Sequence, residues 1–128
     1  MSLKAKIMVV EDNIDEAKLV KMILEPEGYE VITAVNGKEA EELLKKEKPD
    51  LFILDVMMPE RDGFYFCEWI RENKDYKDIP VILLTGVAKR ILDSKYPLNG
   101  LLRADADEYL EKPVKPEVLL ETITKFLK

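Results

Sequence analysis

Acidic residues follow two apolar runs of this sequence. Glu11 and Asp12 come directly after residues 6–10. Asp55 comes directly after residues 51–54. Asp and Glu are poor strand residues, so an acid that closes such a run gives up packing that an apolar residue would supply. Any one of these acids could merely cap a loop, but their convergence on one edge of a fold would call for a functional explanation.

Three carboxylates held close together repel one another, so either some stay protonated or a cation lies among them. The chain has no histidine, and oxygen ligands with room for water favour Mg²⁺, for which Mn²⁺ could substitute, over zinc or fully caged Ca²⁺. Asp55 is ionised at neutral pH and needs no general base to act as a nucleophile, and aspartyl phosphate is a recognised covalent intermediate. The pattern therefore predicts a divalent metal site beside a phosphorylatable aspartate.

Two further polar residues stand at the ends of later apolar runs. Thr85 closes residues 80–85, and Lys112 follows residues 107–110 after one intervening residue. Thr85 alone could be an ordinary β-branched strand residue. Beside a metal ion, however, a lysine ammonium can hold one oxygen of a transferring phosphoryl group and a threonine hydroxyl another. We therefore expect Asp55, Thr85 and Lys112 to carry the phosphoryl chemistry.

The elements that must position these residues alternate along the whole chain. The predicted strands are 6–10, 29–35, 51–54, 80–85 and 107–110, and the predicted helices are 14–24, 38–46, 64–73 and 115–127. In the first helix the apolar stripe consists of Ile14, Ala17, Val20, Ile23 and Leu24. Pro97 and Asn99-Gly100 interrupt residues 87–104, which predicts two short helical pieces or a mobile loop. Successive strand–helix units imply a doubly wound α/β fold whose ligands bind beyond the carboxyl ends of the strands.

The composition of the chain excludes several classes of function. The chain has 128 residues, of which 47% are hydrophobic, and we expect one domain over 1–128. A net charge of −6 offers no basic field for direct nucleic acid binding or for an anionic membrane. No apolar run approaches the ~20 residues that cross a bilayer, so we expect a cytoplasmic protein. The single cysteine, Cys67, lies in an apolar stretch and is interpreted as a buried structural thiol.

The strand-end motifs together resemble those of the receiver domain of two-component response regulators. They read Val10-Glu11-Asp12, Leu54-Asp55-Val56-Met57-Met58-Pro59, Asp62-Gly63, Leu84-Thr85-Gly86 and Tyr109-Leu110-Glu111-Lys112-Pro113, and the resemblance covers nearly the whole chain. It implies a single flavodoxin-like (βα)5 domain with a five-stranded parallel sheet in the order 2-1-3-4-5 and helices on both faces.

The resemblance also implies roles for individual residues. Asp55 would accept the phosphoryl group, and Asp12, Asp55 and the Met57 carbonyl would bind Mg²⁺, with Glu11 helping through water. Thr85 and Tyr109 would form the family's switch pair.

The implied function is a phosphorylation-activated switch. The phosphodonor would be a sensor histidine kinase or a histidine phosphotransfer protein, and phosphorylation would change the affinity for an unknown downstream protein. The chain would catalyse only its own phosphorylation and slow self-dephosphorylation. It would be a monomer or a weak phosphorylation-dependent dimer.

Alternative functions make different demands on the sequence. The chain could be a receiver excised from a larger regulator or a hybrid kinase, or a pseudo-receiver that is never phosphorylated. A hydrolase of the haloacid dehalogenase type would need a second Asp where Met57 stands. Nucleotide binding would need a G-x-G-x-x-G or G-x-x-x-x-G-K-[ST] loop, and the sequence has neither.

Overall fold

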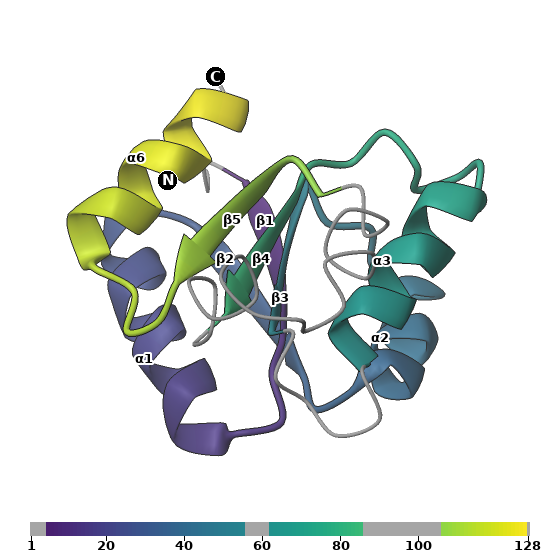
Figure 1. Cartoon of the computed structure of the whole chain (residues 1–128), viewed down its shortest axis with the longest axis horizontal. Helices are drawn as coiled ribbons and strands as arrows, with labels where there is room; N and C mark the ends of the chain where they lie inside the picture. Colours follow the sequence, from purple (N-terminus) through teal and green to yellow (C-terminus); the bar gives the residue numbers. More distant parts are fainter. Residues whose placement is uncertain (1–4, 56–61, 86–105, 128) are drawn as a thin grey trace, which may run out of the picture.

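The computed structural model of the chain describes residues 5–55, 62–85 and 106–127. These residues form five β-strands and four α-helices (Figure 1). The strands are β1 (Lys6–Val10), β2 (Glu30–Ala34), β3 (Leu51–Asp55), β4 (Val81–Thr85) and β5 (Glu108–Glu111). The helices are α1 (Ile14–Leu24), α2 (Gly37–Leu44), α3 (Asp62–Glu72) and α6 (Pro116–Phe126), with a short 3-10 turn at Glu25–Glu27. No helix among these residues is long and apolar enough to cross a membrane.

The strands form one parallel sheet in the order β2-β1-β3-β4-β5. Helices α1 and α6 lie on one face of this sheet, and α2 and α3 lie on the other (Figure 1). The predicted flavodoxin-like, doubly wound α/β fold with strand order 2-1-3-4-5 is therefore confirmed. Because every strand runs in the same direction, all five carboxyl ends meet at one edge, which we call the carboxyl edge, and all five amino ends meet at the opposite amino edge.

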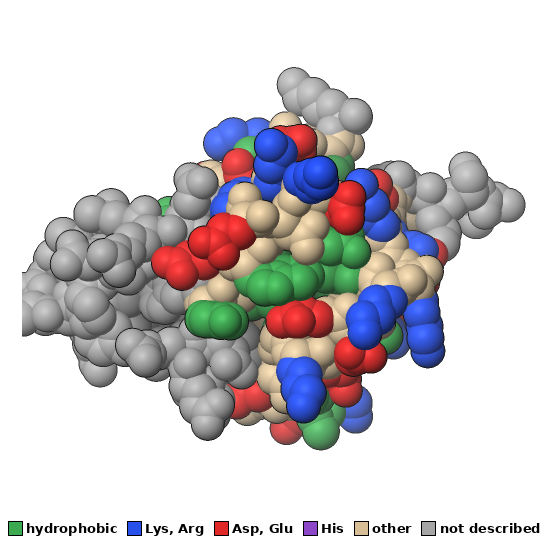
Figure 2. All heavy atoms as spheres, turned by 90° about the vertical axis from the view of Figure 1, so that its right-hand side faces the viewer, with side chains coloured by type: hydrophobic (Ala, Val, Ile, Leu, Met, Phe, Trp, Pro, Cys, Tyr) green, Lys and Arg blue, Asp and Glu red, His purple; other side chains and the backbone are tan. Residues whose placement is uncertain are grey.

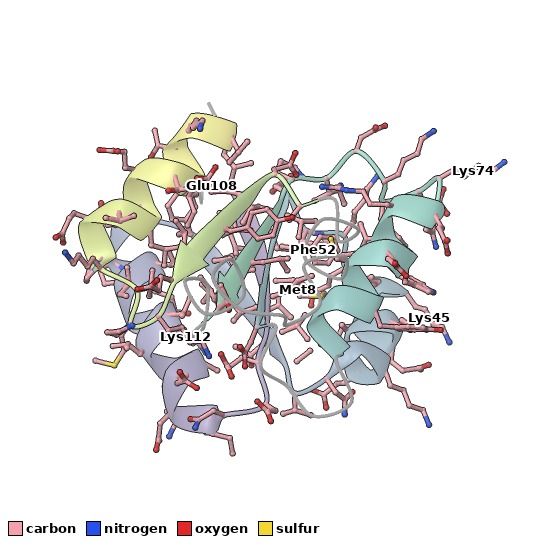
Figure 3. All side chains as sticks on the ribbon, viewed as in Figure 1. Met8, Lys45, Phe52, Lys74, Glu108 and Lys112 are labelled. Carbon is pink, nitrogen blue, oxygen red and sulfur yellow. The ribbon has the colours of Figure 1, made fainter. Side chains whose placement is uncertain are left out.

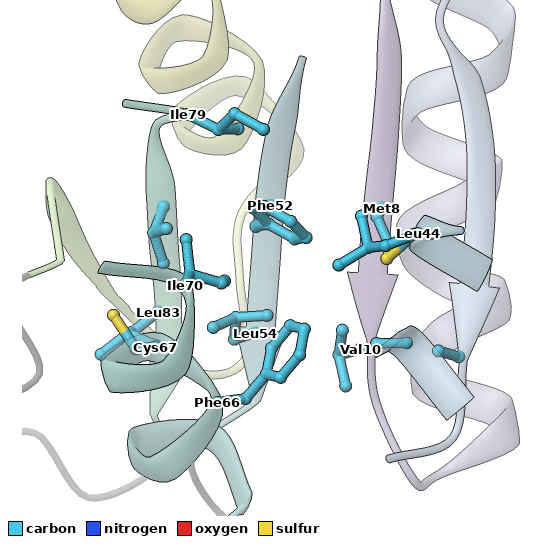
Figure 4. Packing of buried hydrophobic residues seen from close by; sticks show 13 residues of the cluster. Met8, Val10, Leu44, Phe52, Leu54, Phe66, Cys67, Ile70, Ile79 and Leu83 are labelled. Carbon is cyan, nitrogen blue, oxygen red and sulfur yellow. The ribbon is translucent and has the colours of Figure 1, made fainter. Parts of the chain in front are cut away.

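Alternation along the strands divides the core into two clusters. Met8, Phe52 and Leu54 point toward α2 and α3 and pack around Phe66 (Figures 3 and 4). Their neighbours in sequence, such as Ile53, point toward α1 and α6. Burial on both faces explains why the central strands read as continuous apolar runs rather than as alternating ones.

The boundaries of the elements differ slightly from the predicted ones. The second helix begins one residue earlier than expected, at Gly37, because the side chain of Asn36 caps it by accepting a hydrogen bond from the N–H of Glu39 at 2.8 Å. The inward stripe of α1 is confirmed at its buried members Ala17, Val20 and Leu24. Ile14 was wrongly assigned to the stripe, since it is 64% exposed. It is the first residue of α1, whose first turn extends past the carboxyl ends of the strands (Figure 1). The predictions for residues 87–104 lie outside the described residues.

The packing of α3 is aromatic. The ring of Trp69 stacks between Phe66, at a centroid distance of 5.4 Å, and Tyr76, at 5.9 Å. Cys67 is fully buried beside them, as expected for a structural thiol. The outer face of α2 and α3 carries interspersed acidic and basic side chains around a small hydrophobic area (Figure 2).

An ion pair fixes the amino edge. Arg71 at the end of α3 donates from Nη1 to the carbonyl oxygens of Lys77 (2.8 Å) and Ile79 (2.9 Å), and from Nη2 to Asp107 Oδ2 (2.7 Å). The same oxygen of Asp107 accepts the N–H of Val81 at 2.8 Å. The N–H of Asp107 in turn donates to the carbonyl oxygen of Val81 at 2.8 Å. These bonds set the start of β5 against the start of β4, and so fix where β5 delivers its last residues at the carboxyl edge.

Candidate functional site

The predicted carboxylates meet at the carboxyl edge. Val10 of β1 pairs in register with Leu54 of β3, so the residues that follow each of them lie side by side. One carboxylate oxygen from each of Glu11, Asp12 and Asp55 lies within 4.8 Å of the others. Glu11 and Asp55 are each only 2% exposed, whereas Asp12 faces solvent.

Lys112 reaches this cluster from the far end of the chain. It follows β5 directly, and its N–H donates to the carbonyl oxygen of Thr85 at 2.9 Å. Its side chain extends toward α1 (Figure 3). There, its Nζ lies 3.0 Å from Asp55 Oδ1, 3.1 Å from Glu16 Oε1 and 3.3 Å from Glu11 Oε1. A lysine ammonium has three donors, and here three carboxylates surround it.

Thr85 and Tyr109 lie on neighbouring strands. Thr85 is the last residue of β4 and is fully buried, while Tyr109 of β5 is 36% exposed. Tyr109 pairs in register with Leu83. Side chains two apart on a strand point to the same face, so Leu83, Thr85 and Tyr109 share one face of the sheet. The structure thus places Thr85 and Tyr109 as diagonal neighbours on adjacent strands.

Burial and charge change the acidity of the buried groups. Burial, followed by the neighbouring Asp55 carboxylate, raises the pKa of the Glu11 carboxyl to about 8, and the Lys112 ammonium and the N–H of Asn13 oppose the rise. For Lys112 burial alone would lower the pKa, but Asp55, Glu16 and Glu11 outweigh burial, and the pKa is raised. The ammonium is therefore charged throughout the physiological pH range, and acidic groups outnumber it.

The donor set fits a hard divalent cation. Glu11, Asp12 and Asp55 offer only oxygen ligands, which suit Mg²⁺ or Mn²⁺, and the exposed position of Asp12 leaves space for water on the metal. An additional positive charge would also relieve the repulsion that raises the pKa of Glu11. Met57, whose carbonyl is the remaining expected ligand, lies outside the described residues.

Sequence reasoning missed Glu16 at this site. Asn13 and Glu16 stand three residues apart at the start of a helix, which is the spacing of a capping box. That pattern assigns Glu16 a purely local role. Its contact with Lys112 joins residues 96 positions apart in sequence, and no spacing along the chain signals it.

Comparisons with known proteins agree with this geometry. The sequence model for the response regulator receiver domain matches residues 7–124. A probable transcriptional regulator ycf27 of Cyanophora paradoxa is 39% identical over 125 residues, which are 98% of this chain and 49% of that protein. The polar-differentiation response regulator DivK of Brucella anthropi is 32% identical, with 94% of each chain covered.

Among solved structures, the signal receiver domain of a signal transduction histidine kinase from Syntrophus aciditrophicus superimposes with a TM-score of 0.86. Its sequence identity is 37%, and the match covers 96% of this chain and 89% of that one. The chain spans about half the length of the ycf27 proteins it matches but nearly all of the DivK protein.

Proposed function

The chain belongs to the response regulator receiver domain family, and from this premise we propose that it is a switch turned on by phosphorylation of Asp55. Receiver domains are signalling switches rather than metabolic enzymes. The observation that carries the proposal is the contact between Lys112 Nζ and Asp55 Oδ1 at 3.0 Å, inside a cluster of acids that fits a divalent cation.

In the proposed reaction a carboxylate oxygen of Asp55 attacks the phosphorus of a phosphohistidine on the donor protein. The P–N bond breaks as the P–O bond forms, and the imidazole leaves with the electron pair. Lys112 then turns a donor from the carboxylate to a phosphoryl oxygen, and the Thr85 hydroxyl binds another. Mg²⁺ or Mn²⁺, held by Asp12, Asp55 and the Met57 carbonyl with Glu11 acting through water, would neutralise charge on the phosphoryl group.

The readout follows from the shared sheet face of Thr85 and Tyr109. Movement of Thr85 toward the phosphoryl group would free space for Tyr109 and shift the population of two arrangements of the surface near β5. A downstream protein would bind one of them more tightly. This is also why we assign a switch rather than a pseudo-receiver, since acceptor, lysine, acids and switch pair are all present.

In this proposal the protein is cytoplasmic, and its phosphodonor is a sensor histidine kinase or a histidine phosphotransfer protein. The 128 residues contain no histidine, so the phosphohistidine must lie outside them. The match to nearly all of DivK is compatible with a stand-alone switch, and the match to about half of the ycf27 proteins is compatible with a receiver joined to an output domain. Monomer or weak phosphorylation-dependent dimer is the proposed state.

Labelling by a small phosphodonor tests the acceptor. We expect acetyl phosphate and Mg²⁺ to add one phosphoryl group to the wild-type chain, detected by intact mass, and hydroxylamine to remove it as expected of an acyl phosphate. Asp55→Asn should not be labelled because the amide is not a nucleophile at neutral pH. Asp78→Asn, an exposed change at the amino edge, is the control and should be labelled normally. Full labelling of Asp55→Asn would exclude Asp55 as the acceptor.

A further inference from the structure

Glu16 stands where a helix cap is expected but forms a different contact. In a capping box the third helical residue binds the N–H of the capping residue. Half of this pattern is present, since the side chain of Asn13 accepts the N–H of Glu16 at 3.0 Å. The other half is absent, because the N–H of Asn13 donates to Glu11 Oε2 at 3.2 Å. The carboxylate of Glu16 lies instead 3.1 Å from Lys112 Nζ.

The three carboxylates around Lys112 are not equivalent. Asp55 becomes the acyl phosphate, and Glu11 belongs to the acid cluster that fits the cation. Glu16 belongs to neither group. Its carboxylate comes from the first turn of α1 and is 43% exposed, so it does not need a metal ion to offset its burial. Of these three partners, Glu16 alone can keep its contact with Lys112 when the phosphoryl group and the cation are present.

A lysine needs such support at a phosphoryl site. Its ammonium ends a flexible four-carbon stem, and holding that stem in one rotamer costs side-chain conformational entropy. When Asp55 is phosphorylated, Lys112 exchanges a bond to a carboxylate for one to a phosphoryl oxygen. A fixed second partner keeps the ammonium close to that oxygen. We propose that Glu16 is a positioning residue that holds the Lys112 ammonium at the phosphoryl group, an inference that rests on the proposed function.

The negative charge of Glu16 also acts on the phosphodonor directly, and this electrostatic effect can be distinguished from the positioning of Lys112. Removing a negative charge near the site should help an anionic phosphodonor to bind and speed labelling. Loss of positioning should slow the transfer step itself. The two effects have opposite signs. Asp15 lies beside Glu16 in the same helical turn and is exposed, so Asp15→Asn reports the charge effect alone.

The experiment measures the rate of Asp55 labelling against acetyl phosphate concentration at saturating Mg²⁺. We expect Glu16→Ala to lower the saturating rate about fivefold, with little change in the half-saturating donor concentration. Glu16→Gln should lie between Glu16→Ala and wild type, because its amide oxygen still accepts a hydrogen bond from Lys112. Asp15→Asn should match or slightly exceed wild type. If Glu16→Ala fails to fold, the rate of Glu16→Gln decides.

A second measurement reports the lysine directly and needs no turnover. With Mg²⁺ and beryllofluoride, which stands in for the phosphoryl group, the ¹⁵Nζ resonance of Lys112 should be protected from exchange in wild type. It should broaden in Glu16→Ala and persist in Asp15→Asn. The resonance is assigned by its absence in Lys112→Arg.

Different results would overturn the positioning role of Glu16 and the proposed phosphorylation of Asp55. Wild-type rates and an unchanged Lys112 resonance in Glu16→Ala would overturn the positioning role while leaving phosphorylation of Asp55 intact. An equal loss in Asp15→Asn would also overturn it, since the effect would then belong to the helix rather than to Glu16. A wild-type chain that is not labelled, or labelling of Asp55→Asn, would instead refute the proposed function.

Discussion

Each edge of the sheet gathers ionised side chains around one cation, but the two clusters are built differently. At the amino edge the guanidinium of Arg71 pairs with the carboxylate of Asp107, and its Nη1 donates to two backbone carbonyls. At the carboxyl edge one ammonium, that of Lys112, meets three carboxylates, and a further acid, Asp12, lies beside them. These contacts pair one cation with one acid at the first edge and leave the acids in excess at the second.

The comparison teaches how to tell a structural ion cluster from a reactive one. The bonds of Arg71 and Asp107 connect α3, the segment before β4 and the start of β5. At the carboxyl edge the acids outnumber the ammonium, and burial and the Asp55 carboxylate raise the pKa of Glu11. An excess of acids beside a raised pKa is a common feature of functional sites, and the proposed function uses the carboxyl edge in this way.

The largest effect should come from removing the cation of the carboxyl edge. We expect Lys112→Ala to lower the rate of Asp55 labelling by acetyl phosphate roughly 100-fold, the scale of losing one donor to a developing phosphoryl charge. Lys45→Ala, which breaks an exposed pair with Glu42, is the matched control and should leave the rate unchanged. A wild-type rate for Lys112→Ala would show that the lysine has no part in transfer.

Substitutions at the amino edge should lower the stability of the fold and leave the rate of Asp55 labelling unchanged. We expect Arg71→Ala to lower the free energy of unfolding by about 2 kcal/mol, because it leaves Asp107 and two carbonyl groups without their charged donor. Arg71→Lys should lose less of the free energy of unfolding, since lysine keeps the positive charge but lacks the forked donors of the guanidinium. Urea unfolding measures both.

Well below the melting temperature, Arg71→Ala should be labelled at Asp55 at the wild-type rate. A specific loss of labelling in the folded variant would mean that the two edges are coupled, and the distinction between them would have to be abandoned.

The same comparison shows what the sequence could predict. The strand order and the convergence of Asp12, Asp55, Thr85 and Lys112 on one edge followed from alternating elements and the family motifs, because parallel strands must end together. The structure leaves the roles assigned to these residues as predictions.

What sequence reasoning missed are contacts without a local signal. Arg71 and Asp107 are 36 residues apart, and each reads as an ordinary surface charge. Glu16 fits a helix cap so well that its spacing points away from Lys112. Ile14 continued an apolar stripe, yet its exposure depends on where the sheet ends beneath α1, which periodicity does not reveal.

The smallest predicted effect is a pH dependence that belongs to the carboxyl edge. The pKa of Glu11 is about 8 in the folded chain and near its ordinary value of 4.5 in the unfolded one. Between these values the folded state holds more protons, so stability must fall as pH rises. Asp55 and Lys112 face Glu11, and the raised pKa of Lys112 keeps that group protonated throughout.

In EDTA we therefore expect the free energy of unfolding to drop by about 1 kcal/mol between pH 6 and pH 7, the scale set by one proton. Glu11→Gln cannot titrate and should show a much flatter profile. Mg²⁺ should also flatten the wild-type profile, because a bound cation stabilises the ionised cluster. Arg71→Ala should keep the wild-type slope at lower stability, since it leaves Glu11 and the groups that face it unchanged. A slope retained in Glu11→Gln would show that the acidic excess is not what makes the carboxyl edge sensitive to pH.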